Sequence, residues 1–169
     1  MRAIVRNTAR NTARSTARST ARIATLVCIV AAFAFADAHD DVMDVVASMA
    51  GALTEQNGTG IALVHGNVSK FMAEFSKDMP DYDTVKNNVT ALVNAGEISS
   101  SILPLTEEDA GETYKIDLDW LLEIRNLEQD GPLIRRREVV HLELRKEKKH
   151  WKVVALKPLD FFAPAKLGQ

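Results

Sequence analysis

The chain has 169 residues, with 21 basic and 23 acidic side chains and a formal net charge of −2. The first 38 residues hold six arginines and one acid, so the remainder has 15 basic and 22 acidic residues and a net charge of about −7. This balance argues against a nucleic-acid-binding protein, because neutralising phosphates requires concentrated lysine and arginine. The single cysteine, Cys28, lies in the first 38 residues, so the remainder has no disulfide, no thiolate nucleophile and no cysteine-based metal site.

The beginning of the chain has the parts of a secretory signal peptide. Six arginines are spread through a Thr/Asn/Ser tract, and an apolar run from Ile23 to Ala36 follows, with small residues up to Ala38. The apolar run is about 14 residues long, shorter than the ~20 residues that a spanning helix needs. We therefore predict that residues 1–38 are a cleaved signal peptide and that residues 39–169 form a single domain. The mature protein is then periplasmic or extracellular and makes no stable membrane insertion.

Three segments after this leader carry apolar residues at helical spacing. The first covers residues 40–56, the second covers 61–78 and is ended by Pro80, and the third runs to about Ala95. The expected inward-facing residues of the three helices are Val42, Val45, Val46, Met49 and Leu53, then Val64, Val68, Phe71, Met72 and Phe75, then Val85, Val89, Leu92 and Val93.

After Gly96 the apolar residues alternate, which is typical of strands. Pro104 is expected to end the first strand, an acidic loop follows at 106–111, and Gln129–Pro132 forms a hairpin turn. The expected strands are, in chain order, 98–103, 113–127, 133–146 and 151–158. The fold class is therefore α+β, with three N-terminal helices packed on a curved, four-stranded antiparallel meander sheet.

This order of elements resembles the nuclear transport factor 2-like superfamily, whose members place a cone of helices against a strongly bent sheet. The resemblance covers most of residues 40–162 and includes a last strand that begins with tryptophan after a charged turn, His150-Trp151-Lys152-Val153. It implies a pocket between helices and sheet. The superfamily contains isomerases, dehydratases and hydrolases beside many binding modules, and this chain looks closest to small exported members without an assigned catalytic set.

Asp119 and His141 are the candidate catalytic pair. If the less apolar side of the long strands faced the cone, the two could converge there as an acid–base pair, with the pKa of the aspartate raised by the apolar surroundings. The alternative is that this side faces solvent. Nearly every residue on this side of the strands is charged, which favours the alternative, in which these residues form ordinary surface ion pairs across the sheet.

Tyr82, at the start of the third helix, could donate to an oxyanion or could simply pack. Trp120, Trp151 and Phe71 are candidate ligand contacts, and the simpler interpretation places both tryptophans in the core. The histidines show no metal-ligand spacing, so we predict no metal site and no cofactor.

Three functions remain open. The first is an exported, non-catalytic module that binds a small apolar molecule or a protein partner through its cone or its sheet surface. The second is a structural domain that forms a homodimer through its sheet. The third is a small lyase or isomerase that uses Asp119 and His141. The sequence favours them in this order, because no complete catalytic set can be recognised in it.

Overall fold

The computed structural model describes residues 38–57, 64–126 and 133–164. The predicted signal peptide (1–37 of it) and the predicted turn at 129–132 lie outside the described residues. The described residues from Asp40 onward form one compact unit. Within the described ranges, no helix is long and apolar enough to cross a membrane.

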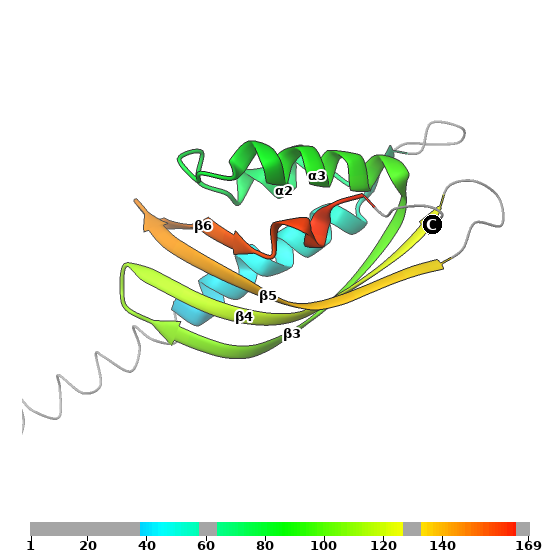
Figure 1. Ribbon diagram of the computed structural model, residues 1–169. Coiled ribbons are helices and arrows are strands. Elements are labelled where there is room, and N and C mark those ends of the chain that lie inside the picture. The colour runs from blue at the N-terminus through cyan, green and yellow to red at the C-terminus, as the bar shows by residue number, and fades with distance from the viewer. Residues whose placement is uncertain (1–37, 58–63, 127–132, 165–169) are drawn as a thin grey trace, which may run out of the picture. The chain divides into compact units, whose positions relative to one another are not determined.

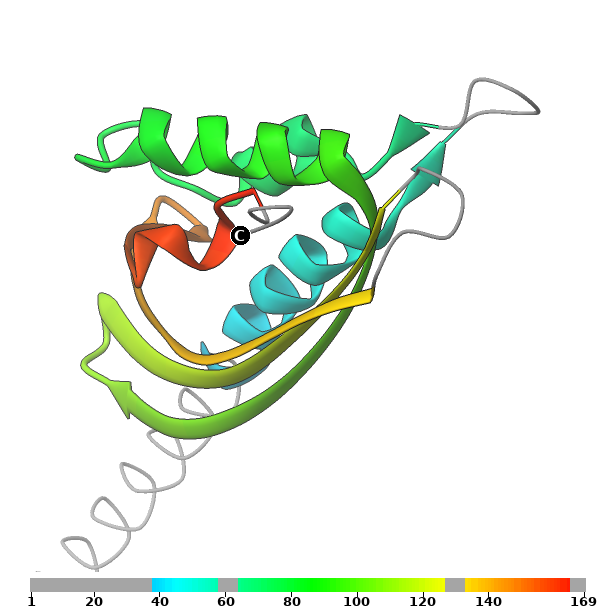
Figure 2. The same ribbon diagram turned by 45° about the vertical axis from the view of Figure 1, so that its right-hand side comes forward.

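Four long strands form one antiparallel sheet in the order β3-β4-β5-β6 (Figure 1). Each strand pairs with the next along the chain, so the sheet is the meander that the alternating pattern predicted. It bends strongly, and the helices lie along its concave side (Figure 2). The strands are β3 (Gly96–Asp109), β4 (Thr113–Asn126), β5 (Leu133–Glu147) and β6 (His150–Lys157). The α+β class is therefore confirmed.

Three helices precede the four-stranded sheet in the sequence, as predicted. Within the described residues the first of them begins at residue 38, so the helices do not lie at the N-terminus of the full chain. The first helix covers 38–54 of the described residues, α2 covers Val68–Ala73, and α3 covers Tyr82–Ala95. The predicted inward-facing residues of the first helix and of α3 are all buried. The apolar stripes of these two helices were therefore read correctly, because a helix against a sheet buries one face.

The second helix is much shorter than the predicted 61–78. Its expected first half contains β2 (Val64–His65), which pairs with β1 (Gln56–Asn57) in a separate two-stranded sheet. Gly66 then adopts a φ of 72°, a left-handed conformation that cannot belong to a helix. Asn67 caps α2 by accepting a hydrogen bond from the backbone N–H of Lys70 at 3.0 Å.

Pro104 does not end β3. The strand continues to Asp109, so the segment expected as an acidic loop is mostly strand. Two features allow this: β3 is at the edge of the sheet, and the register with β4 shifts between Pro104 and Thr106. Proline is tolerated at an edge or a bulge because the missing N–H need not serve a neighbouring strand.

One side of the long strands forms the core. Alternate residues of β4 are at most 3% exposed: Tyr114, Ile116, Leu118, Trp120, Leu122 and Ile124. After β6 the chain turns inward as a short 3₁₀ helix, η1 (Leu159–Phe162), and the side chains of Phe161 and Phe162 are fully buried. The sequence indicated an aromatic end but gave no reason to place it in the core.

Candidate functional site

The concave side of the sheet is filled by aromatic side chains. The ring of Phe162 lies 5.2 Å from Trp120, 5.3 Å from Phe71 and 4.9 Å from Phe161, measured between ring centroids. All four residues are fully buried, and Trp120 Nε1 donates a hydrogen bond to Ser100 Oγ at 2.8 Å. Trp120 and Phe71, two of the candidate ligand contacts, thus contact the chain's own C-terminal turn.

Arg136 holds this turn in place. Its Nη1 donates to the backbone carbonyl oxygens of Phe161 and Ala163, the latter at 2.8 Å. On the helix side, Asn88 Nδ2 donates to the carbonyl oxygen of Leu159 at 3.0 Å. Sequence reasoning missed this role of Arg136, although strand alternation had already placed it on the opposite face from Arg135 and Arg137.

Asp119 lies on the outer, convex face of the sheet. Its carboxylate accepts two hydrogen bonds from Arg137, to Nε at 2.9 Å and to Nη2 at 2.5 Å. This guanidinium holds the pKa of Asp119 below its usual range. An acid–base role inside the cone would require an apolar environment that raises the pKa of the carboxylate. The environment of Asp119 has the opposite effect.

His141 also lies on the outer face, but with a different partner. Its Nδ1 is 2.6 Å from Asp117 Oδ1, and Thr106 Oγ1 donates to the other oxygen of Asp117 at 2.8 Å. These hydrogen bonds, that of His141 first, lower the pKa of Asp117. In the sheet register Asp119 is opposite Val139 and Asp117 is opposite His141, so strand pairing does not bring Asp119 and His141 together.

Tyr82 begins α3 and lines a hollow of about 600 Å³ between α2 and α3. The apolar part of the lining comes mainly from Val68, Met72 and Phe75, and Lys77 and Lys86 add positive charge. The side chain of Tyr82 is half-buried. Tyr82 therefore lies beside a surface hollow and on a different element from Asp119 and His141.

Trp151, the remaining candidate ligand contact, is 2% exposed. Its ring packs edge-on against Tyr114 at 5.9 Å, and Lys146 Nζ lies 5.5 Å from the ring centroid. The hydroxyl of Tyr114 donates to Glu107 Oε2 at 2.5 Å, and burial followed by this hydrogen bond raises the pKa of Tyr114 well above its usual value. Trp151 also lines a pocket beside the first helix.

The outer face of the sheet carries exposed apolar side chains. Leu103 of β3 is 58% exposed and Val139 of β5 is 42% exposed, and both lie directly opposite Asp119 of β4. Leu105, at the register shift of β3, and Leu133, at the start of β5, are 49% and 44% exposed. Because directly paired residues point to the same side, Leu103 and Val139 flank the Asp119–Arg137 ion pair.

The chain has weak similarity to known proteins. No protein-family model matches the chain, and no curated protein matches its sequence. One solved structure, a designed NTF2-like protein named as a variant of Rd1NTF2_05, is 13% identical, covers 62% of this chain and 72% of its own, and has a TM-score of 0.31. A TM-score of this size does not establish a shared fold. In the part of the chain that the structure describes, no three His, Cys, Asp or Glu side chains form a group that could hold a metal ion.

Proposed function

We propose that this chain is an exported, non-catalytic interaction module with a nuclear transport factor 2-like fold, and that the outer face of β3, β4 and β5 pairs with a second copy. The observation that carries the proposal is the exposure of Leu103 and Val139 on either side of the ion-paired Asp119. Contiguous exposed apolar patches mark protein–protein interaction sites, and Leu103 and Val139 would form the apolar centre of such a site.

The outer face is large enough for a stable contact. β3 and β4 each have 14 residues and β5 has 15. At about 3.3 Å per residue and about 4.8 Å between strands, three such strands present on the order of 650 Å² before side-chain relief is counted. A standard protein interface covers about 800 Å² on each partner. Pairing of two copies along this face would therefore reach the usual size.

The charges of this face suit a second copy better than a strongly charged partner. Arginines alternate with acids in pairs such as Arg137 with Asp119 and Arg135 with Glu123, at 2.5 and 2.7 Å. Positive and negative groups are therefore mixed here, whereas the predicted mature chain as a whole has a net charge of about −7. A mixed surface is self-complementary and avoids the like-charge repulsion that the acidic remainder would produce.

The interior supports the non-catalytic part of the proposal. In a nuclear transport factor 2-like enzyme the reaction would take place within the cone, and here Trp120, Phe71, Phe161 and Phe162 fill that side of the sheet. Asp119 and His141 are on the other side, each with its own charged partner. The helix-then-meander order and the bent sheet support the fold part of the proposal.

The test is the oligomeric state of the mature chain. Native mass spectrometry and light scattering across a range of concentrations should show a dimer. Replacing Leu103→Asp together with Val139→Asp should give a monomer, because two carboxylates would be buried unpaired in the contact. The control adds the same charge on the exposed surface of α3, as Asn87→Asp together with Asn94→Asp, and should remain a dimer. A wild-type protein that stays monomeric, or a control that dissociates equally, contradicts the proposal.

A further inference from the structure

The hollow of about 600 Å³ between α2 and α3 shares no residue with the outer face of the sheet. Val68 and Met72 line it from α2, one helical turn apart. Tyr82 and Lys86 line it from α3, also one turn apart, and Lys77 belongs to the connection between the two helices. Because side chains four positions apart lie on the same side of a helix, the hollow is bounded by one side of each helix.

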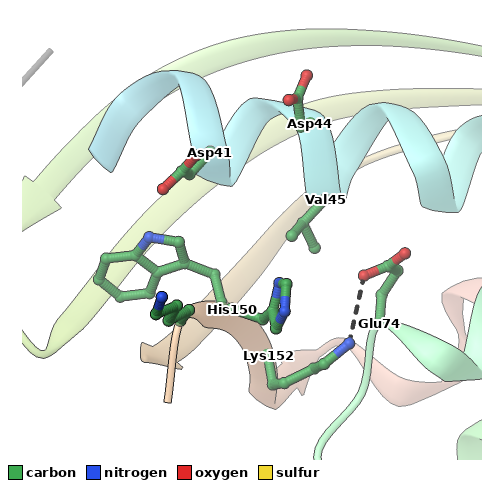
Figure 3. Close-up of a pocket in the computed structure, with 8 residues that line it drawn as sticks. Asp41, Asp44, Val45, Glu74, His150 and Lys152 are labelled. Atoms are coloured by element: carbon green, nitrogen blue, oxygen red, sulfur yellow. Dashed lines mark ion pairs between the residues drawn. The ribbon is translucent and has the colours of Figure 1, made fainter. Parts of the chain in front are cut away.

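Both helices are held in place by contacts outside the hollow. Figure 3 draws one of them at the end of α2, where Lys152 Nζ lies 3.6 Å from Glu74 Oε2. The same Nζ donates to the carbonyl oxygen of Ala73 at 2.5 Å. α3 is held separately, through the hydrogen bond from Asn88 to the carbonyl oxygen of Leu159. The space between the helices is therefore preformed, as ligand pockets usually are.

The cations of the hollow are not used by the protein itself. Among the described residues, the side chains of Lys77 and Lys86 make no ion pair, and the hydroxyl of Tyr82 makes no hydrogen bond. None of the described residues that line the hollow is acidic. This local positive charge contrasts with the net charge of about −7 of the predicted mature chain, and it favours an anionic group.

Accessible apolar surface beside these cations is a separate observation. Val68 and Tyr82 are half-buried and Ala73 is exposed, so each presents surface to the hollow. Met72 and Phe75 are 4% and 3% exposed and form its floor. The volume lies within the roughly 300–1,000 Å³ of small-molecule sites, which combine a mainly apolar lining with a few polar groups.

We propose that the hollow between α2 and α3 binds a medium-chain fatty acid. The hydrocarbon chain lies along Val68, Ala73 and the ring of Tyr82. The carboxylate contacts Lys77 and Lys86 and accepts a hydrogen bond from the hydroxyl of Tyr82. An inorganic anion would leave the apolar surface uncovered, and an uncharged alcohol of the same chain length would leave both cations unpaired.

The experiment is a titration of the mature protein with sodium octanoate, followed by NMR at the backbone amides. The resonances of Ala73 and Tyr82 should shift progressively and saturably. The indole N–H of Trp120, which is buried and bonds Ser100, is the internal reference and should stay in place. Octanol should bind about fivefold more weakly, because it makes no ion pair, and octylammonium should give no saturable shift.

Matched variants separate the hollow from general charge effects. Lys86→Gln should weaken octanoate binding about threefold, whereas Lys149→Gln removes the same charge from an exposed position outside the hollow and should leave binding unchanged. Lys77→Gln together with Lys86→Gln should weaken it about tenfold. Ser69→Glu adds a carboxylate to the lining in the first turn of α2, where an acid suits the helix, and should also weaken binding.

The outcome does not depend on dimer formation. The variant with Leu103→Asp and Val139→Asp, which tests the outer face, should bind octanoate as the wild type does. The proposal is overturned if Ala73 and Tyr82 show no saturable shift up to about 10 mM octanoate, or if octanol binds equally well. It is also overturned if the two single lysine variants have equal effects, or if only phosphatidylglycerol vesicles, and not octanoate, shift these resonances.

Discussion

Truncating Phe162 tests the central packing of this fold. Phe162 is fully buried and its ring contacts those of Trp120, Phe71 and Phe161 within 5.3 Å. Replacing a buried phenylalanine with alanine usually costs about 3–5 kcal/mol, and each aromatic contact adds about 0.5–1.5 kcal/mol beyond area burial. With three ring contacts we expect Phe162→Ala to cost about 4–5 kcal/mol, a large part of the roughly 5–15 kcal/mol that stabilises a domain.

The assay is urea unfolding followed by tryptophan fluorescence, with thermal unfolding as a second measurement. For a domain of this size the expected loss corresponds to a fall in Tm of roughly 15 °C. Phe162→Leu keeps most of the apolar volume and should cost about 1–2 kcal/mol, and Leu133→Ala, at a site 44% exposed, about 0.5 kcal/mol or less. If Phe162→Ala stays within about 1 kcal/mol of the wild type, η1 does not belong to the core and the reasoning about the filled cone is refuted.

Three further outcomes follow from single contacts. Gly66→Ala should destabilise by about 1–3 kcal/mol in chemical unfolding, because φ is 72° there and a Cβ would lie 2.8 Å from Val93 Cγ2; an unchanged midpoint would contradict that backbone geometry. Asn88→Ala should cost about 1 kcal/mol through its lost bond to the C-terminal turn, and Asn88→Asp, which keeps the shape but not the donor, should not restore it. The pKa of Asp117 is lowered in the folded state, so the stability that its ionised carboxylate contributes is present above about pH 4 and is lost as pH falls through the folded pKa. Asp117→Asn should therefore reduce the fall of Tm at acid pH. A fall of Tm identical to that of the wild type would show that the pairing of Asp117 with His141 does not contribute to stability.

Much of the fold could be predicted locally. The alternation from Tyr114 to Ile124 placed the correct residues of β4 in the core, and the stripe of the first helix did the same, because burial on one face imposes a period that sequence records directly. The second helix was predicted wrongly because its sequence pattern is compatible with two kinds of secondary structure. Val64 fits a helical stripe and a strand equally well, and only the left-handed Gly66 decides between them.

The candidate site depended on contacts that no local pattern contains. Sequence left two sides of the sheet open for Asp119 and His141, and the register decided that they take Arg137 and Asp117 as partners. Trp151 was singled out as a possible ligand contact, but Asp41, which lines the same pocket from the first helix, lies 110 positions earlier in the chain. Neither residue type nor spacing could have paired them.

The sequence alone determined the class of the fold and which face of each long element is apolar, since hydrophobic periodicity is a property of neighbouring residues. The tertiary structure decided that Phe161 and Phe162 return to fill the concave side of the sheet, that Asp119 on the outer face pairs with Arg137 and Asp117 with His141, and that Asp41 lines a pocket with residues of the β5–β6 turn. Each of these outcomes depends on the curvature and register of the sheet, which arise only when distant segments pack together.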